Sequence, residues 1–418
     1  MSSLSIASYN IHGFNTDKST VIDKIVANHT FVLLQEHWLH ENQIHLLNSI
    51  PGTSNTGVSG MPSGELLSGR PYGGCAILWK NTFNGKVEPV RFNSTRLCGV
   101  IISANYLSSP ILLTSVYMPA DTLYDKNNSD EYSSILSEIT SLSNDLNISS
   151  VIIGGDFNTD FDRVNSLHTK ELNLLCTNFE YVPWINCVPN SVDFTFESKI
   201  DSSKSLIDHF ILSKTLAEQV VVVAALHSGD NLSDHSAISI KLDINTEHTT
   251  APQRQIQPKV IWDKATDSDI NNYKTNLDAK LKTLGNYDSC FNCNDLNCSN
   301  NNHNKSIDEI TTNLIEYTIE AAFDTLPTSQ SNERPKGKCI PGWKENIEPL
   351  KQDTLFWHSL WRSCGSPQHG FIAFNRRRSR ALYHRAIKKC RKERESIIAN
   401  KIVSAHVAKD ITLILEIS

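Results

Sequence analysis

The chain has 418 residues, which is too long for one comfortable hydrophobic core and favours two or three structural units. The composition is ordinary for a soluble protein, 39% hydrophobic and 20% charged, and the longest apolar run, Val220–Leu226, is far too short to cross a membrane. The first residues lack the pattern of a signal peptide, so we expect a nuclear or cytoplasmic protein that is not secreted, with no membrane partner. Ten cysteines then indicate thiols or metal ligands rather than disulfides.

The first part of the chain alternates short β-rich runs with longer mixed stretches, which predicts an α/β or α+β fold. The clearest predicted helix is Asp130–Leu146, with apolar residues at a period near 3.6 and acidic residues in its first turn. The segment Pro51–Arg70 is rich in Gly, Ser, Pro and Asn and predicts a loop. The predicted strands are Ser5–Tyr9, Phe31–Gln35, Gly74–Trp79, Leu97–Ser103, Leu112–Tyr117, Val151–Gly154, Ser205–Ser213, Val220–Ala225 and Ala237–Leu242.

The pattern changes after Leu242. Polar residues at 245–258 indicate a linker, and 290–304 is an insert rich in Cys and Asn. A helical period returns at Ile307–Phe323, and from Trp343 the pattern is helical almost to the end, interrupted at Gly365–Gly370. We therefore divide the chain into a catalytic domain at 1–244, a linker with a helix at 245–330, and a basic helical region at 331–418.

Six short motifs in the first region carry residues suited to phosphodiester hydrolysis, and most of them follow a predicted strand. Hard oxygen ligands such as Asn10 and Glu36 suit Mg²⁺. Each motif alone has a structural explanation, because an Asp-x-Asn after a strand is usually a turn and a lone His is usually a core residue. Their joint occurrence in one order favours a single site. The motifs are SYNIHG, LLQEHW, SVYMP, IIGGDFN, LIDHFILS and NLSDHS.

This order of motifs resembles the endonuclease/exonuclease/phosphatase superfamily over about Leu4 to Leu242. The resemblance implies a four-layer sandwich, in which two β-sheets are flanked by helices, and a site that uses Mg²⁺ (or Mn²⁺). It implies metal-binding positions at Asn10, Glu36 and Asp234, and catalytic positions at Tyr117, Asp156, Asn158, Asp208 and His235. One departure is His12, since many repair enzymes of the superfamily carry an acid two residues after the first Asn.

The stretches IIGGDFNTD, DFTFES and SLIDHFILS are similar to the apurinic-type endonucleases of non-LTR (LINE-type) retrotransposons. That similarity implies a substrate-side role for Thr195. It also predicts a DNA endonuclease that nicks one strand and derives from a truncated or domesticated element. Two alternatives stay open: a phosphatase or phosphodiesterase acting on a lipid or small molecule, and an inactive nucleic-acid-binding remnant.

Two features beyond the first region point to further ligands. The spacing of Cys290, Cys293, Cys298 and His303 resembles a zinc knuckle with exchanged ligand types, and three thiolates with one imidazole suit Zn²⁺. The alternative is an Asn-rich loop with incidental cysteines. The stretch Arg376–Arg394 is densely basic and would suit contact with DNA phosphates, although a solvated helix face or a nuclear import signal explains it equally well.

Overall fold

The chain folds into two compact units, Met1–Thr249 together with Lys336–Ser418, and Thr250–Pro335. None of the helices in the described part of the chain is long and apolar enough to span a bilayer. The computed structural model describes residues 3–14, 16–61, 69–103, 107, 109–121, 126–198, 201–244, 259–260, 262–284, 300–329 and 340–407.

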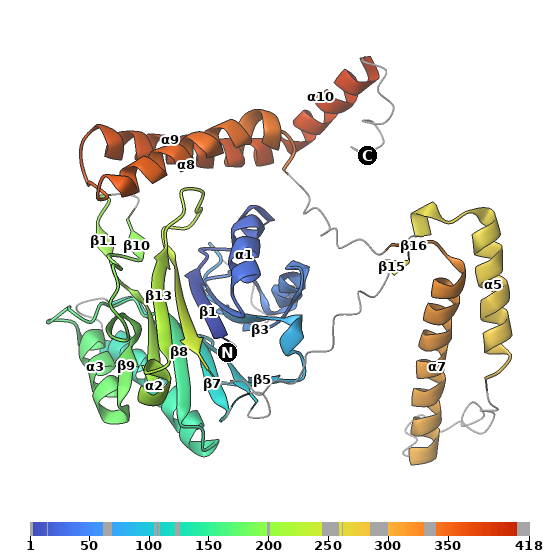
Figure 1. The fold of residues 1–418 in the computed structure, drawn as a ribbon, viewed down its shortest axis with the longest axis horizontal. Coiled ribbons are helices and arrows are strands. Elements are labelled where there is room, and N and C mark those ends of the chain that lie inside the picture. The colour runs from blue at the N-terminus through green and yellow to red at the C-terminus, as the bar shows by residue number, and fades with distance from the viewer. Residues whose placement is uncertain are drawn as a thin grey trace. The chain divides into compact units, whose positions relative to one another are not determined.

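The first unit contains two six-stranded mixed sheets that pack face to face (Figure 1). Each sheet has one parallel pair at its centre, β1–β2 in the first and β7–β8 in the second, and its other pairs are antiparallel. The first sheet has the order β13 (Val220–Leu226), β14 (Ala237–Asp243), β1 (Ser3–Asn10), β2 (Phe31–Gln35), β4 (Cys75–Lys80) and β3 (Thr53–Val58). The second has the order β5 (Val87–Val90), β6 (Leu97–Ile102), β7 (Ile111–Tyr117), β8 (Ser150–Asp156), β12 (Asp208–Ser213) and β9 (Tyr181–Pro183).

Helices cover the outer faces of both sheets and complete four layers. Apolar residues of α1 (Thr16–Asn28) and the 3₁₀ helix η1 (Glu41–Ser49) pack with the outer face of the first sheet. Those of α2 (Lys126–Asp145) and α3 (Leu167–Phe179) pack with the outer face of the second. A third cluster fills the space between the sheets. This arrangement confirms the predicted fold class, two sheets flanked by helices and followed by a mostly helical C-terminal region.

The structure corrects three local predictions. The predicted loop Pro51–Arg70 contains strand β3, whose sequence TSNTGV is too polar to show an apolar alternation and which is half-buried throughout. The predicted strand Ser205–Ser213 begins only at Asp208, and Lys204–Ser205 forms β11, which pairs with β10 (Phe196–Glu197) in a separate hairpin. Helix α2 begins at Lys126, so its first turn carries no acidic residue.

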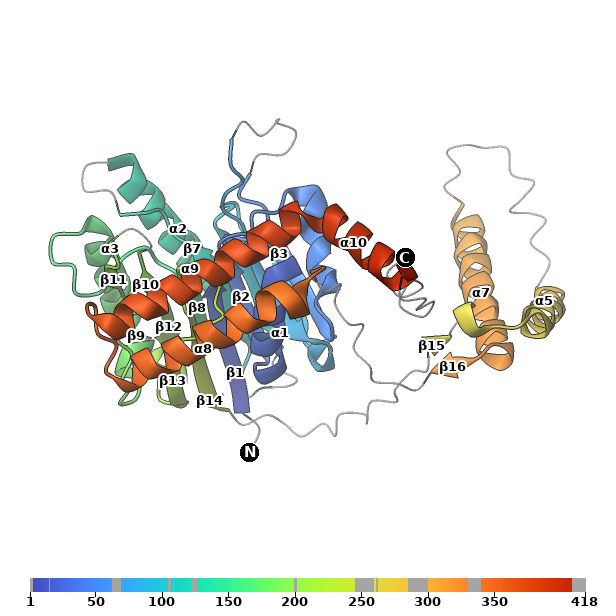
Figure 2. The same ribbon diagram turned by 90° about the horizontal axis from the view of Figure 1, so that it is seen from above.

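The C-terminal part of the first unit is helical. A short π-helix, η5 (Trp343–Ile347), leads into an antiparallel pair formed by α8 (Glu348–Ser363) and α9 (Phe371–Lys392). We call α8 and α9 the C-terminal hairpin. Figures 1 and 2 show the hairpin lying across one end of the sandwich, beside β10 and β11. Helix α10 (Arg394–Val407) follows it.

The second unit is an antiparallel pair of helices, α5 (Asp267–Leu281) and α7 (Asn301–Thr325), with a short strand pair. Thr266 caps α5 by accepting a hydrogen bond from the Asp269 backbone. The remaining short elements in the described residues are η2 (Asn81–Phe83), η3 (Trp184–Asn186), η4 (Trp262–Lys264), α4 (Lys214–Ala217), β15 (Lys259–Val260) and β16 (Thr328–Ser329).

Candidate active site

Strand register brings the predicted site residues to one edge of the sandwich. Asn10 ends β1 and pairs in register with Gln35, the last residue of β2, so Glu36 follows beside it. In the other sheet, Asp156 at the end of β8 pairs with Tyr117 on one side and with Asp208 on the other. Since β12 is antiparallel to β8, its first residue meets the last residue of β8. The topology therefore gathers residues from distant parts of the chain.

Asn10 connects the two sheets at this edge. Its Nδ2 donates to Glu36 Oε1 at 2.9 Å and to Asp156 Oδ2 at 2.8 Å. Its Oδ1 accepts from the backbone N–H of His12 at 3.1 Å. Asn10 and Asp156 are buried, whereas Glu36 is partly exposed to the pocket. The amide thus fixes the separation of two carboxylates that would otherwise repel each other.

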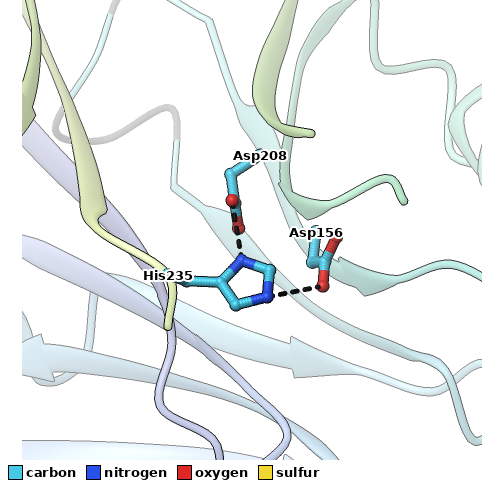
Figure 3. A group of neighbouring side chains, drawn as sticks. All are labelled: Asp156, Asp208 and His235. Atoms are coloured by element: carbon cyan, nitrogen blue, oxygen red, sulfur yellow. Dashed lines mark hydrogen bonds and ion pairs between the residues drawn. The ribbon is translucent and has the colours of Figure 1, made fainter. Parts of the chain in front are cut away.

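His235 lies between two buried aspartates (Figure 3). Its Nδ1 contacts Asp208 Oδ2 at 2.8 Å, and its Nε2 faces Asp156 Oδ2 at 3.8 Å. The ring of Phe196, on β10, packs against the imidazole with ring centroids 5.0 Å apart. Asp208 therefore fixes the orientation of the ring, and Nε2 faces the carboxylate at the end of β8.

The two carboxylates decide the charge of this histidine. Burial alone would lower the pKa of His235, but the charges of Asp208 and Asp156 and the hydrogen bond from Asp208 outweigh burial and raise it. Burial raises the pKa of Asp156 above its usual range, against the opposing effects of His235 and the Asn10 hydrogen bond. A pair of this kind can exchange a proton with a water or a substrate held beside it.

Several residues at this edge adopt a left-handed backbone, which is uncommon outside glycine. Glu36 has φ 53°, Asn158 has φ 52°, His12 has φ 50° and Trp38 has φ 58°. Such conformations cost free energy and collect at functional sites, where they aim side chains. Trp38 Nε1 donates to Glu36 Oε2 at 3.0 Å, so the strained turn also fixes the Glu36 carboxylate.

The remaining predicted residues lie in or beside the same pocket, which has a volume of about 320 Å³. Asn158 lines it and donates its Nδ2 to Met118 O at 2.8 Å. Tyr117 lies against Glu36 and Asp156, and burial together with these carboxylates raises the pKa of its hydroxyl, which stays neutral. Asp234 lines the pocket next to His235.

Thr195 is placed differently from the other predicted residues. Its side chain is fully buried, and its Oγ1 accepts from the backbone N–H groups of Ile207 and Asp208, each at 3.1 Å. Thr195 therefore holds the start of β12, and with it Asp208, and does not line the pocket. The geometry therefore does not favour a contact between the Thr195 side chain and the substrate.

The pocket has donors that fit a divalent cation. Its lining includes the carboxylates of Glu36, Asp121, Asp156 and Asp234, which are hard oxygen ligands in a half-enclosed space. Asp156, Asp208 and His235 also offer one ligand atom each within 4.8 Å of one another. The 2.8 Å contact to Asp208 already occupies His235 Nδ1. We therefore regard the pocket-facing carboxylates as the better cation ligands.

Sequence reasoning missed several residues of the pocket. His12, noted above as a departure, places Nδ1 3.5 Å from Asp234 Oδ1 and 3.9 Å from Glu36 Oε2, between two predicted metal positions. Arg163 also lines the pocket, and Arg70 lies beside it over the Trp38 ring, 4.4 Å from the ring centroid. Neither arginine stands in a motif, so the sequence carries no signal for them.

The structure describes only one of the four predicted zinc ligands. Cys290, Cys293 and Cys298 lie outside the described residues, and His303 lies in the first turns of α7.

A larger pocket of about 380 Å³, beside α1 and β1, is mainly apolar. Among the described residues that line it, the one carboxylate is Asp230, which is paired with Lys24 at 2.7 Å.

Comparison with known proteins identifies the class. Residues 7–235 match the endonuclease/exonuclease/phosphatase family, and the chain belongs to this family. It is therefore a hydrolase of that fold with a candidate metal site. No curated protein matches the chain at the level of sequence.

Solved structures resemble the chain at low identity. The AP endonuclease LMAP of Leishmania major has 15% identity and a TM-score of 0.48, with 57% of this chain and 87% of that one covered. The 3′ phosphatase NExo of Neisseria, bound to a product DNA hairpin, has 14% identity and a TM-score of 0.46, with 57% and 99% covered. The endonuclease domain of TRAS1, a telomere-specific non-LTR retrotransposon, has 13% identity and a TM-score of 0.42, with 58% and 99% covered.

Proposed function

We propose that this protein is a divalent-metal-dependent DNA endonuclease that nicks one strand by attack of water on phosphorus. The observation that carries the proposal is the convergence of the Asn10–Glu36 pair and the Asp156–His235–Asp208 group at one pocket. Within the proposal, residues 1–244 form the catalytic region, 245–330 a linking region, and 331–418 a basic region that contacts DNA.

The chain's own residues divide the chemistry. Asp156, buried and with a raised pKa, accepts a proton from the attacking water. His235, held by Asp208, faces the same space through Nε2 and binds the scissile phosphate or transfers a proton. Asn158 carries two N–H donors on its amide and, with the neutral Tyr117 hydroxyl, donates to phosphoryl oxygens in the transition state.

Glu36, Asn10 and Asp234 would hold Mg²⁺ (or Mn²⁺) at the pocket. When bound, the cation would polarise the phosphoryl group and offset the charge that develops on it. His12 lies between two of these ligands, so its neutral form is the one compatible with cation binding.

A charged surface on helix α9 favours DNA over a small substrate. Helix α9 has 22 residues, and so extends for about 33 Å, which exceeds the length of a small phosphate ester. Its outward face carries a row of exposed basic side chains. These are Arg377, Arg378, Arg385, Lys388, Lys389, Arg391 and Lys392. Such a row suits the regularly spaced phosphates of a duplex.

Two finer parts of the proposal come from the sequence. The motif similarities described above support an origin in a LINE-type retrotransposon. The spacing of Cys290, Cys293, Cys298 and His303 supports a zinc site in the linking region. Zinc analysis of protein purified without chelators would give one equivalent of Zn²⁺ if this is right, and a Cys293→Ser variant would lose it.

The test of the main proposal is a supercoiled-plasmid assay with Mg²⁺, with and without EDTA, beside a phosphoinositide-release assay. We expect open-circular DNA to form before linear DNA, only with free metal, and no release of inorganic phosphate. An Asp156→Asn variant purified in parallel controls for contaminating nucleases. Phosphate release from phosphoinositides without nicking would overturn the proposal in favour of a lipid phosphatase.

A further inference from the structure

Helix α9 reaches the backbone of the loop that carries Asp234 and His235. Arg380 donates from Nη2 to Ser233 O at 2.5 Å and to Asn231 O at 3.1 Å. Its guanidinium lies in a mostly buried position, with 21% of the side chain exposed. Residues 371–392 lie beyond residues 7–235, which match the family, so this contact adds to what the family match covers.

The loop that Arg380 contacts is connected directly to the site. Ser233 Oγ donates to Asn10 O at 2.8 Å and accepts from the His235 backbone N–H at 3.1 Å. Between β13 and β14 the loop contains no helix or strand, only an isolated backbone bridge of His235 to Phe196. Its conformation therefore depends on that bridge and on side-chain contacts such as these, and a shift of Ser233 would disturb its contacts with both Asn10 and His235.

The other side of His235 is also attached to α9. The ring of Phe196 packs on His235, and Glu197 is the next residue. The backbone N–H of Glu197 donates to Asp234 O at 3.0 Å. The Glu197 carboxylate forms a two-point ion pair with Arg376, with both contacts at 2.6 Å. Only 7% of the Arg376 side chain and 11% of the Glu197 side chain are exposed.

We propose that Arg380 is a positioning residue for His235, and that the Arg376–Glu197 pair holds the opposite flank of the same histidine. The C-terminal hairpin is then part of the catalytic centre rather than a separate module. Arg380 holds the carbonyl groups that set the path of the backbone into His235. This inference rests on the proposed hydrolase function and adds a region to its site.

Arg362 provides a matched control. It is an arginine of the same hairpin and pairs with Asp193 on the sandwich, with Nη1 and Oδ2 3.2 Å apart. Like Arg380 it anchors the hairpin, but its hydrogen bonds go to Asp193 and to Ser366 of the hairpin and not to backbone carbonyls before His235. Loss of Arg362 therefore tests whether anchoring alone matters, and loss of Arg380 tests the positioning of the loop.

The experiment is steady-state plasmid nicking by the full chain carrying Arg380→Ala, Arg380→Lys or Arg362→Ala. We expect Arg380→Ala to lower kcat about 100-fold with little change in KM, because misplacement by about 1 Å costs that much. Arg380→Lys keeps the positive charge and one donor nitrogen on a more flexible side chain and recovers part of the loss, and Arg362→Ala retains the normal kcat. An unchanged kcat in folded Arg380→Ala, or a rise in KM alone, would overturn the proposal.

A second measurement does not depend on turnover. With ¹⁵N-labelled histidine, the Nδ1 proton of His235 that is shared with Asp208 gives a low-field NMR signal, assigned by its absence in His235→Asn. We expect this signal to broaden or vanish in Arg380→Ala and to persist in Arg362→Ala. Persistence in Arg380→Ala would refute positioning even if the protein proves to cleave no DNA. Failure of the wild type to cleave DNA would instead refute the proposed function.

Discussion

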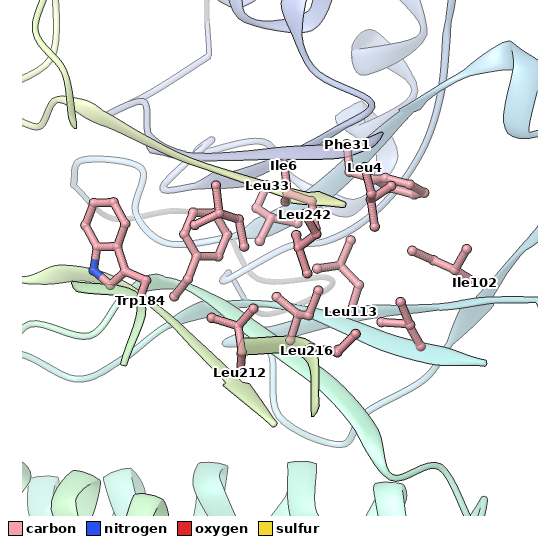
Figure 4. Packing of buried hydrophobic residues seen from close by; sticks show 14 of the residues in the cluster. Leu4, Ile6, Phe31, Leu33, Ile102, Leu113, Trp184, Leu212, Leu216 and Leu242 are labelled. Atoms are coloured by element: carbon pink, nitrogen blue, oxygen red, sulfur yellow. The ribbon is translucent and has the colours of Figure 1, made fainter. Parts of the chain in front are cut away.

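The sandwich and the C-terminal hairpin of the first unit are held together by different kinds of interaction. The space between the two sheets is filled by a large apolar cluster to which both sheets contribute, including Leu33, Leu113 and Leu212 (Figure 4). The hairpin buries only small clusters around Ile387 and Trp361 and is attached through arginines.

The difference has a consequence for the site. Apolar side chains carry no titrating group, whereas ion pairs respond to pH and, where they are exposed, to salt. The carboxylates of the candidate site therefore lie on the apolar sandwich, whereas Arg380 and Arg376, which contact the flanks of His235, lie on the hairpin, whose attachment single charge changes can alter. Mutations can separate the contribution of the sandwich carboxylates from that of the hairpin arginines.

The largest effect should come from breaking the chemistry while leaving the sandwich intact. His235→Ala should reduce nicking about 10²–10⁴-fold, the usual contribution of a general acid or base. Its fold and apparent Mg²⁺ affinity should change little, because the proposed metal ligands are oxygen donors. Plasmid nicking across a Mg²⁺ titration, combined with melting curves, measures both properties.

His209 is the matched control for that variant. It is also a buried histidine of the sandwich, with Nε2 3.0 Å from Thr159 O. His209→Gln should lower the melting temperature while the folded fraction nicks DNA at the normal rate. If His235→Ala behaved like His209→Gln, His235 would be a structural core residue.

A smaller effect is expected from breaking the hairpin's buried ion pair. Glu197→Ala leaves the Arg376 guanidinium without its carboxylate, and losing one partner of a buried pair costs about 3 kcal/mol. Hydrogen exchange should accelerate in α8 and α9 but not in β1 or β8. The exposed pair of Lys214 and Glu180, at 3.7 Å, is the control, and Glu180→Gln should leave exchange unchanged. Uniform acceleration across both sheets would contradict this division.

The attachment of the hairpin should also weaken in mild acid. Burial, with the nearby charges of Arg376 and Arg380, lowers the pKa of His358 on α8 to about 4. A histidine whose folded pKa lies below its unfolded value of about 6.5 stabilises the fold above that value, and this contribution is lost as pH falls towards 4. Because the side chain is partly exposed, we expect a loss of about 1–2 kcal/mol at pH 5.

His358→Gln removes the titrating group and should flatten this response. Hydrogen exchange of α8, compared between pH 7.5 and pH 5 in both proteins, measures the difference. An equal acid response in the two proteins would show that other groups are responsible, such as His227, whose pKa is also lowered by burial and by Arg362.

Much of the sandwich could be predicted because its strands are apolar and continuous. The segments Phe31–Gln35 and Ala237–Asp243 are examples whose β-rich sequence is evident. Strand β3 was missed because its stability comes from pairing with β4 and not from its own side chains. Short strands such as β9 and β10 depend on tertiary contacts in the same way.

The residues of the site also differ in how well the sequence predicts them. Residues within compact motifs, such as Asp156 and His235, could be recognised from order and spacing. The hydrogen bond of the Thr195 hydroxyl to the backbone at the start of β12 could not be predicted, because it depends on the tertiary fold. Arg376 and Arg380 belong to the basic stretch predicted to contact phosphates, but the structure pairs Arg376 with Glu197 and directs Arg380 to backbone carbonyls. The sequence could not indicate this for Arg380, because one of its acceptors lies 147 residues earlier in the chain and any residue type supplies a carbonyl.

The smallest effect on stability should come from the outward face of α9. Arg385 and Lys388 are exposed, so the Arg385→Ala/Lys388→Ala variant should change stability by no more than about 0.5 kcal/mol. If these side chains contact phosphates, each should contribute about 0.9 to the slope of log affinity against log salt concentration, and the double variant should lower the slope by nearly 2. Lys86 provides the control, because it lies at the end of the second sheet opposite the site. It precedes β5, whose first residue Val87 pairs with Ile102, and Ile102 pairs with Ile111 at the start of β7, whereas Tyr117 is at the end of β7. Lys86→Ala should leave the slope unchanged. Binding of a duplex to the catalytically impaired His235→Ala background, measured by fluorescence anisotropy from 50 to 200 mM salt, isolates this contribution from turnover. An unchanged slope in the double variant would mean that the basic face of α9 is a solvated surface, and that the hairpin serves the site through its buried arginines alone.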